Sequence, residues 1–450
     1  MLDGYDLWAY PTGDEKDKEL VQLTTSEKSK GSLHAYGNTV WYEEGGKIYS
    51  VDAEKRSKSR ESVSFDAAME VDQVALWKQM FLEGWSLLDD QFYDPDYHGA
   101  SWDEIRVKYE ALLPFARTTK DYQELMLLMI GELGASHLNF APPSSQDNFT
   151  GDLGIRLDFP RMVDDGSYRV ASVVPDGPSD QDDARIEAGE FLIAIDGVKL
   201  TPGTNLYALL ERKVGKRVEV EVASSASGRG ARTLRIKPVT RNTIIGLLYE
   251  EWVEERREMV DEWSDGKLAY LHIRSMGTAP LRRFRRELVT MADGKDGAIL
   301  DVRYNGGGYT AVHILGILER KPFLLRNFRG LPLTSETKMR SYGYEKPTAL
   351  LINNHSYSNA EILAEGFRKL GLGPIVGIPT AGSVIGTSNL RLMDGSTFRK
   401  PSWGAFTLEG ENLENNGRKP DFHVENRYND WVSGADPQLE KAVEELLKAF

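Results

Sequence analysis

Hydrophobic and polar positions follow different periods along the chain. Residues 1–65 alternate apolar and polar side chains over short runs between turn residues, which predicts strands. In residues 66–146 large apolar side chains recur three and four positions apart, for example at Trp77, Phe81 and Trp85, which predicts amphipathic helices packed in a core. We therefore expect a strand region followed by a helical one.

The rest of the chain holds a β-rich region and then a region of alternating strands and helices. Residues 147–240 carry short apolar runs between glycine turns, such as Val170–Val174 and Val218–Val222. Residues 241–450 alternate apolar strand runs with helical patterns and close with the amphipathic segment Gln438–Phe450. The pattern predicts a multidomain α/β protein whose last domain is an α/β layered one.

Composition fits a globular protein of several domains. A chain of 450 residues is too long for one ordinary core, so about three domains are expected. The net charge of −14 argues against nucleic acid or an anionic membrane as a partner. Because the chain has no cysteine, disulfides, thiolate metal sites and a cysteine nucleophile are excluded. We also expect no metal and no cofactor.

No targeting segment is visible in the sequence. Met1–Asp6 lacks the basic start and apolar core of a secretory signal. No run reaches the roughly 18 apolar residues that a membrane-spanning helix needs. We expect a cytoplasmic protein.

Ser358 is the clearest candidate for chemistry. It follows the apolar run Thr348–Ile352 and precedes the helical run Ile362–Leu370, so a turn would lift its side chain clear of a sheet, next to the unpaired N–H groups of a helix start. A serine in this position can be a nucleophile. The structural alternative is that Ser358 and Glu361 form the S-x-x-E pattern of a helix capping box.

A glycine loop, two histidines and a glutamate are further candidates. Gly306–Gly308 follow a predicted strand, where bare N–H groups could approach an oxyanion; a plain turn is the alternative, and the Gly-Lys-Ser/Thr of a phosphate loop is missing. His355 lies so close to Ser358 along the chain that it cannot easily face the hydroxyl, so we favour His137 as a base. Glu414, taken alone, is expected to be a surface carboxylate.

Four ordered motifs resemble the C-terminal, catalytic half of the tricorn proteases, whose wider relatives are the tail-specific C-terminal processing peptidases. The motifs are Asp301-Val302-Arg303-x-Asn305-Gly306-Gly307-Gly308, Asn353-x-x-x-x-Ser358, Gly377-Ile378-Pro379-Thr380-Ala381-Gly382 and Glu414-Asn415-x-Gly417-x-x-Pro420-Asp421. The resemblance spans about residues 66–450, with helical, β-rich and α/β pieces in the family's order.

Single regions also resemble known modules. Residues 147–240 resemble a PDZ domain, with Asp152–Ile155 in the place of its carboxylate-binding loop. PDZ domains capture extended peptide ends by strand addition. Residues 1–65 resemble the last blade of tricorn's β-propeller, although one blade cannot bury its own faces. The resemblance implies a crotonase-like or ClpP-like fold for the catalytic domain 241–450 and places the catalytic histidine in the helical subdomain 66–146.

The resemblance implies a nucleophile, a base and two supporting residues. Ser358 would attack the peptide carbonyl, and His137 would take its proton and return it to the leaving amine. Ser136 and Glu414 would orient and polarise the histidine. Relatives with a Ser/Lys dyad carry a lysine at the position that falls near Ser383; no lysine lies between residues 374 and 399, so a dyad is excluded.

The same resemblance implies the substrate contacts. The N–H groups of Gly308 and Asn359 would hold the oxyanion, and Asn359, Gly307 and Gly382 would line the substrate site. Tricorn has an aspartate, associated with basic side chains in the specificity pocket, where this chain has Asn359. A preference for basic residues at the cleaved bond is therefore left open.

The function implied is that of a tricorn-type serine peptidase acting on short or unfolded peptides, assembled as a homo-oligomer such as a tricorn-like hexamer. One alternative is a noncatalytic scaffold that binds peptides through the PDZ-like unit. Another is a tail-specific peptidase acting on protein C-termini, and a third is an enzyme of the same fold acting on esters or periplasmic proteins.

Overall fold

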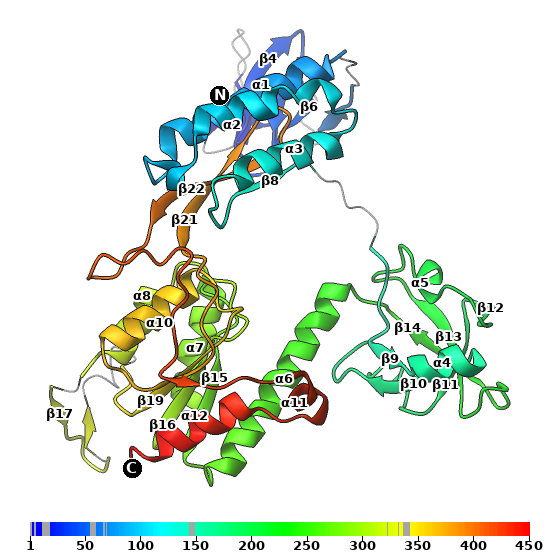
Figure 1. Cartoon of the computed structure of the whole chain (residues 1–450). Coiled ribbons are helices and arrows are strands. Elements are labelled where there is room, and N and C mark those ends of the chain that lie inside the picture. The colour runs from blue at the N-terminus through cyan, green and yellow to red at the C-terminus, as the bar shows by residue number, and fades with distance from the viewer. Residues whose placement is uncertain are drawn as a thin grey trace. The chain divides into compact units, whose positions relative to one another are not determined.

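The computed structural model describes residues 2–3, 6–10, 19–54, 60–65, 68, 70–143, 149–321, 323–331, 333–335 and 343–450. The chain divides into two compact units, Met1–Gln73 and Val74–Phe450 (Figure 1). The expected boundary between residues 146 and 147 lies outside the described residues.

The N-terminal unit consists of two antiparallel sheets, as its alternating pattern predicts. β1 (Leu2–Asp3), β2 (Asp6–Ala9) and β3 (Val21–Gln22) form one, and β4 (Gly31–Tyr36), β5 (Thr39–Glu44), β6 (Lys47–Asp52) and β7 (Glu61–Val63) form a meander. Among its described residues, the buried apolar core consists of Leu7, Leu23, Tyr42 and Val51. Buried Lys30 lies 3.1 Å from Asp6 and 3.2 Å from Glu44, so ion pairs supplement this small core.

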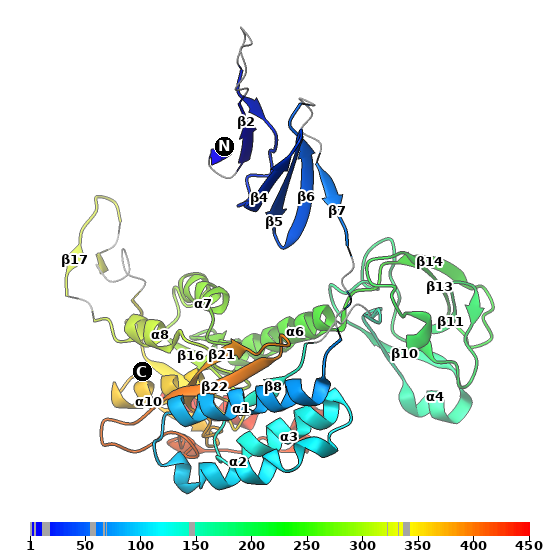
Figure 2. The same cartoon turned by 90° about the horizontal axis from the view of Figure 1, so that it is seen from above.

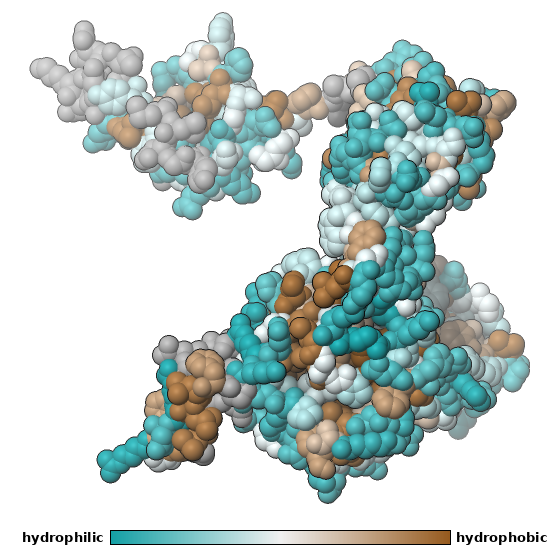
Figure 3. Space-filling view, turned by 60° about the vertical axis from the view of Figure 1, so that its left-hand side comes forward, coloured by the Kyte–Doolittle hydropathy of each residue, from teal (hydrophilic) through white to brown (hydrophobic). Residues whose placement is uncertain are grey.

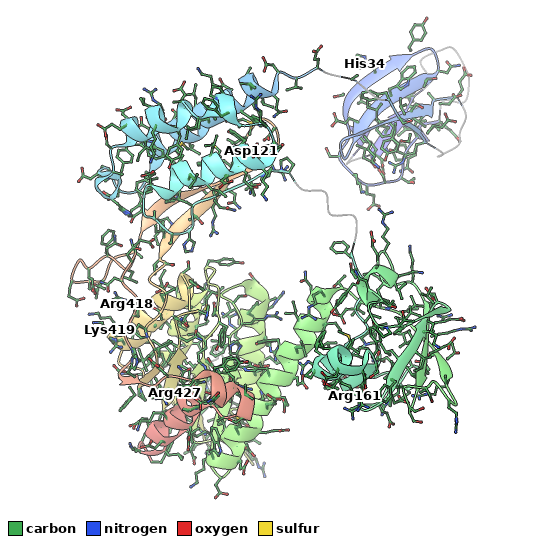
Figure 4. All side chains as sticks on the ribbon, turned by 45° about the vertical axis from the view of Figure 1, so that its right-hand side comes forward. His34, Asp121, Arg161, Arg418, Lys419 and Arg427 are labelled. Atoms are coloured by element: carbon green, nitrogen blue, oxygen red, sulfur yellow. The ribbon has the colours of Figure 1, made fainter. Side chains whose placement is uncertain are left out.

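The second unit begins with the predicted helices. These are α1 (Gln73–Gln91), α2 (Trp102–Glu110) and α3 (Thr119–Gly131), with 3₁₀ turns η1 (Tyr97–Gly99) and η2 (Leu113–Phe115) between them. Trp77 and Phe81 face the shared core, where Trp77 stacks on Tyr122 with ring centroids 5.3 Å apart. A capping box between Thr118 and Asp121 starts α3 (Figure 4), because each side chain accepts an N–H at the other residue.

A hairpin from the C-terminal region packs on these helices. β8 (Asn139–Ala141) pairs with β22 (Thr397–Gly404), which pairs with β21 (Ile385–Arg391). Figure 2 shows this small sheet alongside α1 and α3. Phe140 and Phe398 are directly paired and fully buried among helical side chains. The helical core therefore contains residues from both ends of the second unit.

Residues 149–240 form a separate antiparallel sheet in the order β14-β13-β11-β10-β9, with β12 paired to β11. Its elements are β9 (Ile155–Leu157), α4 (Phe159–Asp165), β10 (Tyr168–Val173), β11 (Phe191–Ile195), β12 (Val198–Lys199), α5 (Leu206–Leu209), β13 (Val218–Ala223) and β14 (Arg232–Ile236). The predicted strands at residues 170–174 and 218–222 are confirmed. Strand β9 is at the edge of this sheet.

The last region is a three-layer α/β structure, as the sequence predicts. Its five strands are all parallel, in the order β15 (Leu268–His272), β16 (Gly297–Asp301), β19 (Thr348–Ile352), β20 (Ile375–Gly377) and β23 (Phe422–His423). One face is covered by α7 (Thr278–Thr290), α8 (Ala311–Leu318) and α10 (Asn359–Lys369), and the other by α6 (Arg241–Trp263) and α12 (Pro437–Leu447). Burial on both faces explains why these strands are continuously apolar.

The described residues of this region also form α11 (Tyr428–Ser433) and the hairpin strands β17 (Leu325–Arg326) and β18 (Thr334–Ser335). Apolar side chains gather on the hairpin arm (Figure 3), where Phe323 and Leu331 are exposed. In the part of the chain that the structure describes, no helix combines the length and apolar character needed to cross a membrane.

Candidate active site

Ser358 lies at the sharp turn between β19 and α10, as the sequence predicts. Its φ of +56° and ψ of −115° are outside the regions that a serine normally adopts, so the turn is strained. The Ser358 N–H donates to a carboxylate oxygen of Glu361 at 3.0 Å and is also 3.1 Å from the carbonyl oxygen of Ser383. These two acceptors hold the backbone of the turn in place.

Glu361 does more than cap the helix. Its fully buried carboxylate also accepts hydrogen bonds from the Thr380 hydroxyl at 2.6 Å and from the N–H groups of Gly382 and Ser383 at 2.7 and 2.8 Å. Burial raises the pKa of Glu361 above its usual value, and these donors, together with the Ser358 N–H, act against that rise. The capping pattern signalled the bond to Ser358 but gave no signal of the link to the Thr380–Ser383 loop.

The glycine loop lies directly against the serine turn. Gly307 has a φ of +87°, and a Cβ at this position would be 2.7 Å from the Cβ of Ser358 and 3.1 Å from the N atom of Asn359. Gly308 has a φ of +141°, and its added Cβ would be 2.3 Å from the carbonyl oxygen of Met276. Only glycine fits at either position without displacing the backbone.

Two N–H groups at this contact are available to a ligand. The Gly307 N–H is already bound to the side-chain oxygen of Asn305 at 2.8 Å. Within the described residues, the N–H groups of Gly308 and Asn359 donate to no protein acceptor. A glycine N–H and the first N–H of α10 are therefore both unpaired beside Ser358, a combination that suits a developing negative charge.

The side chain of Asn359 is turned toward α8. Its amide oxygen accepts the Ala311 N–H at 2.8 Å, at the start of that helix, and the residue is buried. Asn359 thereby joins the starts of α8 and α10 beneath the serine. Its expected contact with substrate stays a prediction.

Ser136, His137 and Glu414 form a second hydrogen-bonded group. The Ser136 hydroxyl is 2.7 Å from Nδ1 of His137 and donates to Glu414 Oε2 at 3.0 Å, while the Ser136 N–H donates to Glu414 Oε1 at 2.6 Å. His137 has a φ of +66°, in the turn between α3 and β8. Burial and then the charge of Arg399 lower the pKa of His137, and Glu414 acts in the opposite direction.

The expectation that Glu414 is a surface carboxylate is wrong. The residue is only 5% exposed, and its Oε2 also accepts the Val384 N–H at 2.7 Å. A buried carboxylate with three donors is well solvated by the protein itself. The loop that carries it is fixed by Arg418, which pairs with Glu365 of α10 at 3.2 Å (Figure 4).

The segment Gly382–Val384 joins the two groups. Gly382 and Ser383 donate to Glu361 beside the nucleophile candidate, and Val384 donates to Glu414 beside the histidine candidate. Among the residues described, no hydrogen bond connects the His137 ring with the Ser358 hydroxyl. His355 stacks on Tyr304 with ring centroids 5.6 Å apart.

A buried ion network beneath the glycine loop was missed from the sequence. Arg303 is fully buried and bonds Asp301 at 2.7 Å and Asp436, at the start of α12, at 2.8 Å. The sequence Asp-Val-Arg after a strand is only a weak signal of an ion pair. The third residue of the network, Asp436, is 133 residues further along the chain than Arg303, so no local pattern could reveal it. The network fixes the end of β16, from which the glycine loop departs.

Comparison with known proteins matches two parts of the chain to known families. Residues 267–424 match peptidase family S41, and residues 73–131 match the tricorn protease C1 domain. The chain therefore contains a peptidase family S41 region, preceded by a region that matches the C1 domain of tricorn protease. The two matches cover both the α/β region with Ser358 and the helices that precede His137.

Individual tricorn proteins align over nearly the whole chain. It is 31% identical over 423 residues to tricorn protease homolog 1 of Streptomyces coelicolor and 30% identical over 414 residues to the tricorn protease of Thermoplasma acidophilum, in each case over 90% of this chain. It spans only 39% and 38% of these relatives' lengths.

A solved tricorn structure and a more distant peptidase complete the comparison. The crystal structure of the tricorn protease superposes with a TM-score of 0.79 at 26% identity, covering 96% of this chain and 42% of that one. A chloroplastic C-terminal processing peptidase of Tetradesmus obliquus is 24% identical over 80% of both chains. The multidomain α/β architecture is therefore shared with tricorn.

Proposed function

We propose that this chain is a serine peptidase of tricorn type that hydrolyses peptide bonds in short or unfolded peptides. The observation that carries the proposal is the strained Ser358 turn pressed against Gly307, with the unpaired N–H groups of Gly308 and Asn359 beside it. Strain of this kind persists where a reactive side chain must be exposed in one orientation. A helix cap alone would need no second N–H donor from a neighbouring loop.

Each residue has a distinct role in acyl transfer. The Ser358 hydroxyl attacks the peptide carbonyl while His137 accepts its proton, and the two unpaired N–H groups stabilise the negative oxygen of the tetrahedral intermediate. His137 then returns the proton to the leaving amine, and water hydrolyses the acyl-enzyme. Ser136 holds Nδ1 of His137 and relays the charge of Glu414, which favours the imidazolium that forms during the reaction.

The described residues show no hydrogen bond between the His137 ring and the Ser358 hydroxyl. Catalytic hydrogen bonds are often long before substrate binds and tighten in the complex. The two residues come from different parts of the second unit, the turn before β8 and the turn before α10. We propose that bound peptide brings them within reach of each other.

Single substitutions test the assignment. Ser358→Ala should abolish hydrolysis of a fluorogenic peptide and labelling by a serine-directed phosphonate while circular dichroism is unchanged. His137→Ala should reduce kcat by several powers of ten, whereas His355→Ala should retain most activity. Hydrolysis that survives Ser358→Ala would refute Ser358 as the nucleophile. If His137→Ala kept its activity and His355→Ala lost it, His355 would be the base.

Peptide binding by residues 149–240 is a second candidate function. The edge strand β9 and helix α5 line a groove of about 490 Å³ that includes Ile155, Leu206 and Leu210. We propose that this PDZ-like unit adds an extended peptide to β9. If the chain is only a scaffold, the wild type will bind a labelled peptide and leave it intact. If the chain is a peptidase, the wild type will cleave the peptide, and only Ser358→Ala will bind it without cleavage.

The groove is better suited to internal peptide segments than to chain ends. The loop before β9 uses its Gly151 and Asp152 N–H groups in bonds to Leu210 and Val239, and Asp152 itself accepts the Gly154 N–H. The Arg241 guanidinium beside the groove is already paired with Asp152 at 3.2 Å, so it is less available to a terminal carboxylate. These contacts of the loop before β9 favour a tricorn-type peptidase over a tail-specific peptidase that selects protein C-termini.

The remaining expectations concern the whole protein. We propose a cytoplasmic homo-oligomer, by analogy with tricorn, in which residues 1–65 act as the last blade of a propeller and residues 241–450 as a crotonase-like catalytic domain. Sedimentation velocity of the full-length protein tests the assembly.

A further inference from the structure

A chain of hydrogen bonds joins the loop that carries Glu414 to the turn that follows α3. It begins at Glu414, whose N–H donates to the side-chain oxygen of Asn412 at 3.0 Å. The Asn412 side chain is hydrogen-bonded to the hydroxyl of Tyr93, which lies 2.6 Å from Nε2 of His98. The chain ends where Nδ1 of His98 is 3.0 Å from the carbonyl oxygen of Leu133, just beyond α3.

The chemistry of the partners gives each of these bonds a direction. A carbonyl oxygen can only accept, so Nδ1 of His98 carries a proton and donates to Leu133. In the neutral ring Nε2 then accepts, and the Tyr93 hydroxyl donates to it. Burial raises the pKa of Tyr93, and the Asn412 NH2 group opposes that rise by donating to the Tyr93 oxygen. Donors and acceptors therefore match from one end of the chain to the other, as in a connected polar network.

The two rings in the middle of the chain are fixed by their surroundings. The Tyr93 ring lies directly on the backbone of Gly404, where an added Cβ would be 2.6 Å from ring carbon Cε2. The His98 ring packs edge-on against Phe92 and Tyr93, with ring centroids 5.4 and 5.5 Å apart. The His98 N–H also donates to the Asp94 carboxylate at 3.0 Å. These contacts present both rings to the chain in one orientation.

The chain fixes two segments that must act together. Ser136 bonds Glu414 at 2.6 Å through its N–H and at 3.0 Å through its hydroxyl, so the histidine group exists only while turn and loop stay in register. The hydrogen-bond chain holds the loop at the backbone of Glu414 and the turn at the backbone of Leu133. His137 ends this turn with a left-handed φ of +66°. Misplacement of a reacting group by about 1 Å costs about 10²-fold in rate, so this register matters to catalysis.

We propose that Tyr93 and His98 are positioning residues of the peptidase, which hold the Glu414 loop and the His137 turn in register without touching substrate. The proposal rests on the proposed function, since it places both residues behind the base His137. Their effect on the reaction passes through the bond between Ser136 and Glu414. Breaking the hydrogen-bond chain should therefore matter most while the Glu414 carboxylate is present.

Tyr93→Phe removes the hydroxyl from the middle of the chain and keeps the ring that packs on Gly404. We expect kcat for a fluorogenic peptide to fall about fivefold to tenfold, with KM within about twofold of wild type and the urea midpoint unchanged. Tyr97→Phe is the matched control, because its hydroxyl bonds Asp89 of α1 at 3.0 and 3.1 Å and takes no part in the chain. A Tyr93 variant with normal kcat would overturn the proposal, and so would equal losses in both variants.

His98→Asn tests the second residue. Asparagine tolerates the left-handed φ of +55° at this position, and its shorter side chain can still donate to Leu133 but cannot reach the Tyr93 hydroxyl. The loss in kcat should equal that of Tyr93→Phe, and combining the two substitutions should add little, because both break the same bond. Fully additive losses would contradict a single chain.

A double-mutant cycle with Glu414→Gln separates positioning from a general structural role. If Tyr93 acts through Glu414, Tyr93→Phe should lower kcat by no more than about twofold in the Glu414→Gln background. The same fivefold to tenfold loss in both backgrounds would show independent effects and would refute the proposal. Failure of the peptidase assignment looks different, because cleavage of the peptide would then survive Ser358→Ala.

Discussion

Gly307→Ala is the sharpest test of the geometry around the nucleophile. The added Cβ would lie 2.7 Å from the Cβ of Ser358 and 2.9 Å from the carbonyl oxygen of Tyr357. Optimal contact between carbon atoms is at about 3.5–4.0 Å, so roughly 1 Å of displacement is required. The left-handed φ of +87° adds about 1–2 kcal/mol for a residue with a Cβ. The serine turn, rather than a flexible side chain, must move.

A displacement of this size should be visible mainly in kcat. Misplacement of a reacting group by about 1 Å costs about 10²-fold in rate. The same Cβ would be 3.1 Å from the N atom of Asn359, one of the two proposed oxyanion donors. Loss of such a donor costs about 10²- to 10³-fold. We expect kcat/KM for a fluorogenic peptide to fall by at least about 10²-fold, and the rate of phosphonate labelling to fall in parallel.

Gly306→Ala is the matched control. No heavy atom lies within 4 Å of a Cβ at Gly306, and its φ is not in the left-handed region. This variant should keep kcat/KM within about threefold of wild type. If Gly307→Ala retained normal activity, or if both variants lost activity equally, the proposed contact between the glycine loop and Ser358 would be refuted.

Three further predictions concern the supporting groups. Glu414→Gln leaves one oxygen where three donors converge, and should lower kcat by about 10- to 100-fold with little change in KM; unchanged kcat would contradict the positioning role. The pKa of His137 is lowered from 6.5, so the acid limb of the pH profile of kcat/KM should lie below pH 6.5. The free energy of unfolding should decrease as the pH falls below 6.5, because the unfolded chain then binds the proton more readily than the folded one. An acid limb above 6.5 would contradict this. Asp436→Asn leaves buried Arg303 with one carboxylate and should destabilise the fold by about 3–5 kcal/mol in urea unfolding, whereas Glu444→Gln on the exposed face of α12 should not shift the midpoint.

The sequence predicts features that depend on local pattern. The continuous apolar run at residues 348–352 becomes a strand covered on both faces, and the three- and four-residue spacing at Trp77 and Phe81 becomes the buried side of α1. The turn at Ser358 follows from the junction of one such strand with one helix. Each of these signals lies within about 20 residues of chain, the range over which periodicity can be read.

Features that join distant residues could not be predicted from these patterns. Glu414 reads as a surface carboxylate because a polar loop surrounds it in sequence, yet its donors come from Ser136 and Val384. The pairing of β22 with β8 likewise joins residues 397–399 to residues 139–141. The local spacing of hydrophobic residues contains no information about contacts between such distant segments. The family resemblance supplied the residues of the site, and their hydrogen bonds come from the structure alone.

The segment that joins the two groups also bears on how the nucleophile is activated. In relatives with a Ser/Lys dyad the lysine falls near Ser383, and here the backbone of Ser383 is bonded on both sides, its carbonyl to the Ser358 N–H and its N–H to Glu361. This residue is therefore beside the serine, where a dyad lysine would have to be, but it offers no basic side chain. Its neighbour Val384 instead anchors Glu414, the carboxylate of the histidine group. The segment that carries the lysine in the dyad branch of the family thus anchors here, through Val384, the carboxylate of the proposed His137 base. A lysine introduced at Ser383 should therefore not restore peptide hydrolysis to His137→Ala.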